Sequence, residues 1–85
     1  MLSVVTIIGV VGPKTDSVKR TVEVRRAYNE DKLTPTSDSF DVVLWSRNLG
    51  APFYRIEAGN HIAIKGRLEI CDGRIVVIAE QVNFF

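Results

Sequence analysis

The sequence predicts an all-β fold, a five-stranded barrel with one short helical segment between its third and fourth strands. Five stretches that are rich in β-branched residues, or that alternate apolar and polar residues, are separated by turn residues. Asp72-Gly73 stands between two apolar runs, which is the strongest short-range signal for a β-hairpin. Because 85 residues suffice for one domain only, we expect residues 1–85 to form a single domain.

The first two predicted strands span residues 4–11 and about 18–27. The first is rich in β-branched residues, and Gly9 inside it suggests a bulge or a sharp bend. In the second, Val22 and Val24 are expected to face inward, because alternate residues of a strand point to the same side. A turn at residues 12–17 joins the two, and residues 29–38 form the longest polar loop, which we expect to be functional.

The third predicted strand is Ser39–Trp45, and its two faces differ. One face carries Phe40, Val42 and Leu44. The other carries Ser39, Asp41, Val43 and Trp45. Because an ionised carboxylate is costly to bury unpaired, the face with Asp41 is expected to meet solvent. The only tryptophan of the chain is therefore predicted to lie on the outside of the sheet.

Residues 47–58 are the only candidate for a helix. Gly50 and Pro52 disfavour a long one, so we expect one or two turns that end by Gly59.

The fourth predicted strand alternates between two sets of residues, one for each face. The apolar set is Ile62, Ile64, Leu68 and Ile70, and the other is Ala63, Lys65, Arg67 and Glu69.

The fifth strand runs from Arg74 to about Val82. This order of elements is typical of a five-stranded Greek-key barrel of the oligonucleotide/oligosaccharide-binding kind, the OB-fold. A β-sandwich is the alternative, but it needs seven or more strands. Phe53 and Tyr54 are expected to plug the barrel, and Phe84 and Phe85 to close it or to contact another subunit.

Composition and charge exclude several classes of function. The net charge is +1, so no bulk electrostatic signature indicates a polyanion partner. Cys71 is the only cysteine, which excludes an internal disulfide framework and a cysteine-rich zinc site and favours a reducing, intracellular location, cytoplasmic or nucleoid-associated. No stretch is long enough to span a membrane.

No metal-ligand spacing, nucleotide fingerprint or catalytic arrangement around His61 occurs. We therefore expect no enzyme activity, no cofactor, no metal and no small-molecule substrate.

Several segments together resemble the bacterial single-stranded DNA-binding proteins. They are Val22–Tyr28, Phe40–Trp45, Gly59–Leu68 and the closing stretch Ala79–Phe84. The resemblance implies a homodimer or homotetramer of barrels that holds single strands by aromatic stacking and basic contacts. Tyr28 and Trp45 fall at two stacking positions of that family, and Arg25 and Arg26 lie next to the first of them.

The chain departs from that family in ways that imply a compact variant. Ser39 stands where the family usually has another aromatic residue, and the turn at residues 12–17 is shorter than usual. The hairpin at Asp72-Gly73 is tight, where the family extends a long arm. We also expect no flexible tail with an acidic tip after Phe85, a segment that the family usually has. These departures argue against the wrapping of a long DNA site.

The candidate site residues are aromatic and basic. Trp45 and Tyr28 are the predicted stacking residues, and phosphate contacts are predicted for Arg20, Arg25, Arg26, Lys65 and Arg67. The basic residues are expected to line one groove if the second and fourth strands lie close together. The alternative is a solvated surface on which they pair with Glu23, Asp41 and Glu69. For Trp45, the alternative is cover by a partner subunit or by Phe53-Tyr54.

The predicted function is non-sequence-specific binding of single-stranded DNA in replication, recombination or repair, with RNA left open as a ligand. The alternative is an OB-fold protein-interaction or primosome-type scaffold subunit with weak or no nucleic-acid binding. Short loops, a near-zero net charge and a hydrophobic content of 46% suit that alternative.

Overall fold

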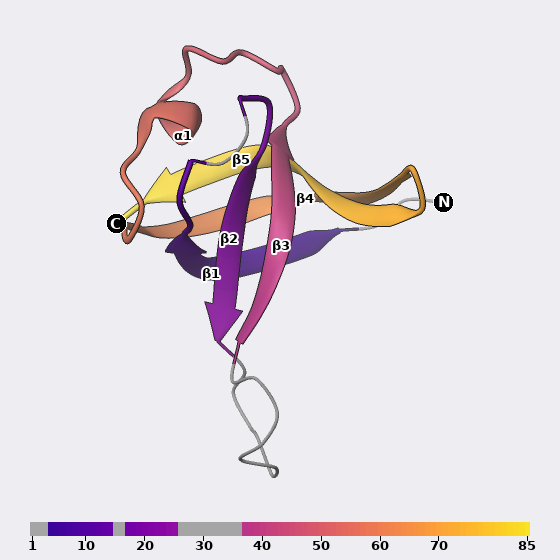
Figure 1. Ribbon diagram of the computed structural model, residues 1–85, viewed down its shortest axis with the longest axis horizontal. Helices are drawn as coiled ribbons and strands as arrows, with labels where there is room; N and C mark the ends of the chain where they lie inside the picture. The colour runs from indigo at the N-terminus through magenta and orange to yellow at the C-terminus, as the bar shows by residue number, and fades with distance from the viewer. Residues whose placement is uncertain (1–3, 15–16, 26–36) are drawn as a thin grey trace, which may run out of the picture.

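The computed structural model describes residues 4–14, 17–25 and 37–85, which form a closed five-stranded barrel with one short helix (Figure 1). The elements are β1 (Val5–Val11), β2 (Arg20–Arg25), β3 (Ser37–Leu44), α1 (Pro52–Arg55), β4 (His61–Cys71) and β5 (Arg74–Phe84). The strands neighbour one another in the order β1-β2-β3-β5-β4, and β4 pairs with β1 to close the barrel. The predicted OB-fold barrel is therefore confirmed.

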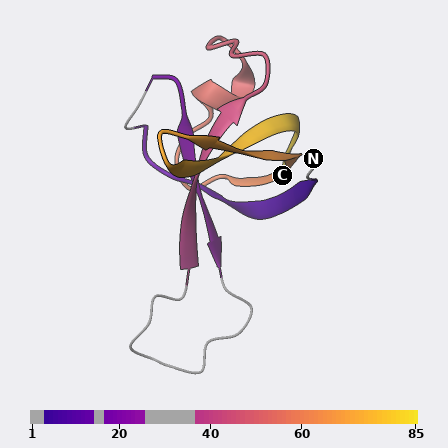
Figure 2. The ribbon, with the colours of Figure 1, turned by 90° about the vertical axis from the view of Figure 1, so that its right-hand side faces the viewer.

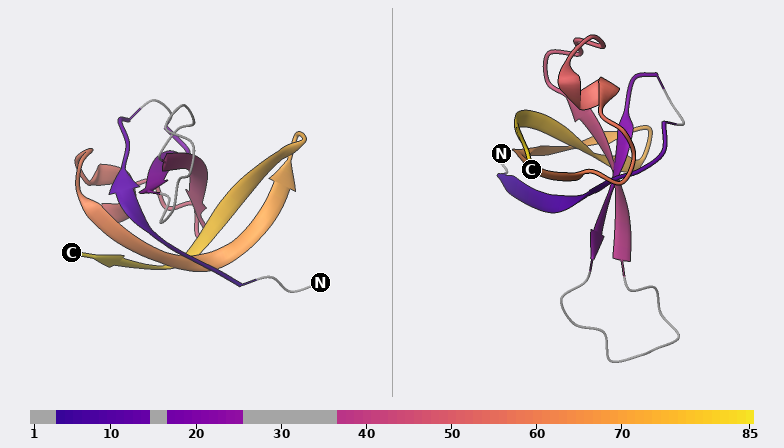
Figure 3. Two further views of the ribbon diagram at one scale, coloured as in Figure 1. Left: turned by 90° about the horizontal axis from the view of Figure 1, so that it is seen from below. Right: turned by 90° about the vertical axis from the view of Figure 1, so that its left-hand side faces the viewer.

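β2 and β3 run side by side and cross β1, β4 and β5 at a steep angle (Figures 1 and 2). The barrel is closed on one side by a parallel pairing of β3 with β5, in which Val43 lies opposite Ile78. The β4–β5 hairpin curves strongly and reaches past β3 (Figures 1 and 3). Its turn is the predicted Asp72-Gly73 pair, and both residues have positive φ angles, 52° and 77°.

A bulge at Lys65/Gly66 bends β4. A Cβ atom at Gly66 would overlap the backbone oxygen of Ile78, so only glycine allows β5 to lie this close. A Cβ atom at Gly9 would likewise overlap the backbone oxygen of Glu23. The predicted bend at Gly9 and the bulge at Gly66 are thus both places where two strands approach closely.

The core is formed by the inward faces of the strands and by α1. It comprises Ile7, Val11, Val22, Val42, Phe53, Tyr54, Ile62, Ile64, Val77 and Ala79. Phe40 and Leu44 pack against it, which confirms the predicted inward face of the third strand. Pro52 begins the single helical turn, and the rings of Phe53 and Tyr54 meet edge to face with centroids 5.0 Å apart. Both rings are buried, so the predicted plug is confirmed.

The apolar face of β4 continues beyond the core. Ile62 and Ile64 are buried, whereas Leu68 is 44% and Ile70 78% exposed. Because the hairpin reaches past the barrel, the second half of the predicted apolar face has no core beneath it. Among the described residues, no helix has the length and apolar character that crossing a membrane requires.

Arg20 differs most from the sequence-based expectation, because it was predicted to contact phosphate from the outer surface. In the structure, Arg20 is only 2% exposed. Nη1 donates hydrogen bonds to the backbone oxygens of Ile56 (2.8 Å), Tyr54 (3.3 Å) and Phe53 (3.4 Å). Nη2 donates to the backbone oxygen of Gly12 (2.9 Å). The prediction for Arg20 is therefore wrong, since the guanidinium is already engaged inside the protein.

The position of Arg20 in β2 explains this burial. Alternation puts it on the same face as Val22 and Val24, which point inward. The carbonyl groups at the end of a helix lack partners within the helix, and the guanidinium supplies five donors to meet them. Burial lowers the pKa of Arg20, and the nearby carboxylate of Glu57 opposes that shift. An arginine side chain nevertheless remains charged in a protein.

Arg20→Met is expected to lower the free energy of unfolding by about 2–4 kcal/mol, because it leaves buried carbonyl groups without donors. Urea denaturation followed by circular dichroism measures the loss. Lys14→Ala is the matched control: Lys14 Nζ also donates to a backbone oxygen of α1, that of Arg55 at 3.3 Å, but at an exposed position. The control is expected to change stability by less than about 0.5 kcal/mol. Equal losses in both variants would contradict the structural role of Arg20.

Candidate nucleic-acid interface

Trp45 directly follows β3 and is 63% exposed. Its backbone N–H donates to the carbonyl of Ala79 in β5 at 2.9 Å, and the next turn is closed by the N–H of Arg47, which donates to Leu44 at 2.9 Å. The backbone under the indole is thus held on both sides. The predicted outward position of Trp45 is confirmed, and neither Phe53 nor Tyr54 covers it, because both are buried in the core.

A cleft with two adjoining lobes lies on the outer face of the barrel, and we name it the β3–β5 cleft. Its lining includes Val43 and Arg47, each of which is two residues from Trp45 in the sequence. Val43 and Arg47 line both lobes. The smaller lobe, of about 260 Å³, is completed by Val18 and Leu49. The larger lobe, of about 360 Å³, is completed by Lys19, Asp41, Cys71, Asp72, Arg74, Val76 and Ile78. Apolar side chains thus alternate with charged ones along a single concave surface.

The charges in the β3–β5 cleft are only partly paired. Lys19 Nζ lies 3.4 Å from Asp41 Oδ2 and forms an ion pair. Arg47 and Arg74 have no carboxylate partner in the described part of the chain. These two guanidinium groups are therefore available to an anionic ligand without the loss of an internal ion pair.

The sequence-based prediction missed Arg47 and Arg74. Arg47 was assigned to the candidate helix and Arg74 to the start of the fifth strand. A usable signal was their position beside turns: Arg47 follows Trp45 by two residues, and Arg74 follows the Asp72-Gly73 hairpin. That these two turns meet at one cleft depends on the pairing of β3 with β5, which lies beyond the reach of local patterns.

The predicted basic residues of the second and fourth strands do not line this cleft. Arg25 is exposed at the end of β2 and lines a separate groove of about 500 Å³ with Ile8, Gly9, Val10, Glu23, Ser37 and His61. Lys65 is exposed on β4, opposite Thr6 of β1. The groove of Arg25 reaches from β2 across β1 to His61 of β4, but neither Lys65 nor Arg67 is among the described residues that line it. Contacts of Arg25 and Lys65 with nucleic acid stay predictions.

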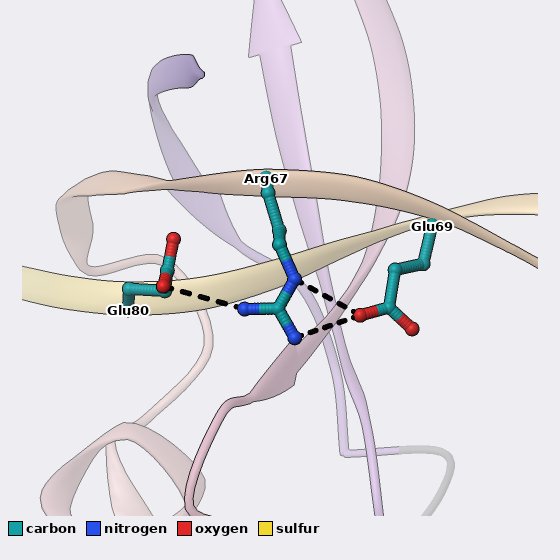
Figure 4. A network of polar contacts seen from close by, with 3 residues as sticks. All are labelled: Arg67, Glu69 and Glu80. Atoms are coloured by element: carbon teal, nitrogen blue, oxygen red, sulfur yellow. Dashed lines mark hydrogen bonds and ion pairs between the residues drawn. The ribbon is translucent and has the colours of Figure 1, made fainter. Parts of the chain in front are cut away.

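Arg67 forms a network with two glutamates on the outer face of the β4–β5 hairpin (Figure 4). Its Nε and Nη2 donate to Glu69 Oε2 at 3.0 and 2.8 Å, and its Nη1 donates to Glu80 Oε2 at 3.3 Å. For Arg67 the structure thus shows the paired surface that was the alternative expectation. A phosphate would have to compete with two carboxylates for it.

Two predicted site residues, Arg26 and Tyr28, lie outside the described residues. Within the described ranges, no group of three or more histidine, cysteine, aspartate or glutamate side chains is placed to hold a metal ion. His61 is exposed and lines the groove of Arg25, and the thiol of Cys71 is free and exposed in the larger lobe of the cleft.

The hydroxyl group of Tyr54 joins two segments beside the β3–β5 cleft. Tyr54 Oη accepts a hydrogen bond from the backbone N–H of Leu44 at 2.9 Å. The same hydroxyl donates to the backbone oxygen of Val18 at 3.0 Å. Val18 lines the smaller lobe, and Leu44 directly precedes Trp45.

Comparison with known proteins gives likeness at the level of structure only. No protein-family model and no curated protein matches the chain. Two crystal structures of Rim1, a mitochondrial single-stranded DNA-binding protein of S. cerevisiae, are similar to it. One has a TM-score of 0.71 at 9% sequence identity, and the superposition covers 99% of this chain and 94% of the Rim1 chain. The other has a TM-score of 0.61 at 10% identity with the same coverage.

At this identity the likeness shows a shared fold, the OB-fold of these single-stranded DNA-binding proteins. Rim1 is mitochondrial, so the resemblance to the bacterial proteins stays an expectation.

Acrylamide is expected to quench the fluorescence of Trp45 with a constant close to that of free tryptophan amide in the same buffer, because the residue is 63% exposed. The chain has one tryptophan, so the signal reports this position alone. Weak quenching in the free protein, independent of protein concentration, would contradict the outward position of the indole.

Proposed function

We propose that this protein binds single-stranded DNA without sequence preference, in the β3–β5 cleft and on Trp45. One observation carries the proposal: an exposed tryptophan follows β3 at the same turn that places Arg47 on the wall of a partly apolar cleft, and no described carboxylate pairs with this arginine. The shared fold with Rim1, which is named as a single-stranded DNA-binding protein, supports it.

The residues present match the two kinds of contact that single strands need. Stacking of a base on an aromatic side chain contributes about 1–3 kcal/mol and tolerates every base. Arg47 and Arg74 supply cations for phosphate groups, and such contacts carry no sequence information. Asp41 and Asp72 line the same lobe and oppose a polyanion, so binding is expected to be moderate, and it should weaken as the salt concentration rises because the two arginines contact phosphate groups.

A titration with oligo-dT at two salt concentrations, followed by Trp45 fluorescence, tests the proposal. Wild-type protein is expected to show salt-sensitive quenching. Trp45→Ala, followed by anisotropy of a labelled oligonucleotide, is expected to bind about ten- to hundredfold more weakly, because it removes a stacking contact. Arg47→Ala and Arg74→Ala are each expected to reduce the slope of log K against log salt by about 0.7.

Arg55→Ala is the matched control, because it removes the same charge from an exposed position on α1 that does not line the cleft. It is expected to bind as wild type. Absence of quenching and of binding at low salt would refute the proposal. Competition by oligo-rU and by duplex DNA identifies the preferred nucleic acid. Replication, recombination and repair, which expose single strands, are the processes in which we propose that the protein acts.

We also propose that the protein acts as a homo-oligomer, a dimer or a tetramer. Ile8 pairs with Ala63 of β4 but not with Arg25 of β2, the described residue that the register of Val10 with Glu23 would place opposite it, so β1 has no ladder partner on that edge at Ile8. Ile8 beside this edge is 61% exposed. An open strand edge with an apolar neighbour is a surface that a second chain can extend. The same observation favours the scaffold function as the second candidate.

Analytical ultracentrifugation is expected to show a species larger than a monomer, and Ile8→Glu is expected to shift it toward the monomer by placing a charge at the contact. Ile70→Glu is the control, because Ile70 is also an exposed isoleucine, at the far end of the hairpin. A wild-type monomer at every concentration, or equal shifts in both variants, would contradict an assembly through β1.

A further inference from the structure

Tyr54 connects the core of the barrel with the rim of the β3–β5 cleft. Tyr54 is 8% exposed, and its ring packs edge to face on Phe53, so its position is set by the core. Its hydroxyl group lies between Leu44 and Val18, with heavy-atom distances of 2.9 and 3.0 Å. One hydroxyl thus uses its donor and an acceptor site on two different segments of backbone.

These two segments belong to opposite parts of the chain. Val18 and Lys19 lead into β2 and line the two lobes of the cleft. Leu44 ends β3 and is followed by Trp45. Because both hydrogen bonds end on backbone atoms, they hold the path of the chain itself rather than a rotatable side chain. The distance between the indole and the lobe lined by Val18 therefore depends on this hydroxyl.

The backbone of Tyr54 is held as firmly as its side chain. Arg20 Nη1 donates to the carbonyls of Tyr54 and of its neighbours Phe53 and Ile56. Arg20 belongs to β2, directly after Lys19 of the cleft. Arg20 thus connects the helical turn with β2. The hydroxyl of Tyr54 connects the same helical turn with the segment before β2, at Val18, and with the end of β3, at Leu44.

We infer that Tyr54 is a positioning residue for nucleic-acid binding: its hydroxyl group holds Trp45 and the Val18–Lys19 segment at the spacing that a bound single strand requires. This inference rests on the proposed function. A tyrosine that only filled the core would need no hydroxyl, and phenylalanine would serve as well there, as the neighbouring Phe53 does. The two hydrogen bonds to the cleft rim distinguish these roles.

Tyr54→Phe tests the inference, because it keeps the ring and removes both hydrogen bonds. The variant is expected to bind oligo-dT about three- to tenfold more weakly than wild type, at a temperature well below its unfolding transition. Acrylamide quenching of free Trp45 is expected to change as well, because the indole loses one of its anchors. Ile64→Val is the matched control: it disturbs the same core from β4 and removes no contact to the rim, so it should lower stability and leave affinity unchanged.

Equal affinity of Tyr54→Phe and wild type would overturn the inference while leaving the proposed function intact, and so would equal losses of affinity in both variants. Absence of binding by wild-type protein would overturn both. Amide hydrogen exchange of the wild-type protein gives a test that depends on no variant. Saturating oligo-dT is expected to slow exchange of the Leu44 amide, whose N–H donates to Tyr54 Oη, and an unchanged rate would also overturn the inference.

Discussion

The buried guanidinium of Arg20 is the interaction on which the arrangement of this barrel depends. It donates to carbonyl groups of α1 and of the turn after β1, and so ties β2 and the end of β1 to a helical turn that lies 33 to 36 residues beyond Arg20. A four-residue helix cannot satisfy its own terminal carbonyls, and a buried charge is tolerated only when it is well hydrogen-bonded. The guanidinium supplies the donors that these carbonyls lack, and the carbonyls supply the acceptors that the buried guanidinium needs. The buried Nε atom of Arg20 has no hydrogen-bond partner among the residues that the structure describes.

The helical turn that Arg20 holds also supports the surface cleft. α1 closes one end of the barrel with Phe53 and Tyr54, and the hydroxyl of Tyr54 then holds the ends of two segments beside the β3–β5 cleft. The cleft combines apolar floor residues with two arginines that no carboxylate engages within the described residues. Arg67, by contrast, is held by two glutamates on the same hairpin. Pairing, rather than the number of basic residues, therefore decides which cations can meet a ligand.

Much of the fold was predictable because it depends on local patterns. Alternation placed Trp45 outside and Val42 inside, and the Asp72-Gly73 pair placed the hairpin. The candidate site was predictable in part: alternation indicated the exposed position of Trp45, whereas no local pattern singled out the basic residues that line the cleft. Arg20 was misplaced although its parity with Val22 indicated an inward position, because arginine is so seldom buried that residue type outweighed alternation.

The sequence by itself determined the five strands, the single helical turn and an exposed tryptophan at the end of β3, because strand alternation and turn chemistry act between residues close in the chain. Only the tertiary structure decided which basic residues share a surface. The parallel pairing of β3 with β5 brings Arg47 and Arg74 to one cleft, whereas Arg25 lines a separate groove to which Lys65 does not contribute. Such neighbours are set by closure of the barrel, which joins residues whose separation in the chain carries no local signal.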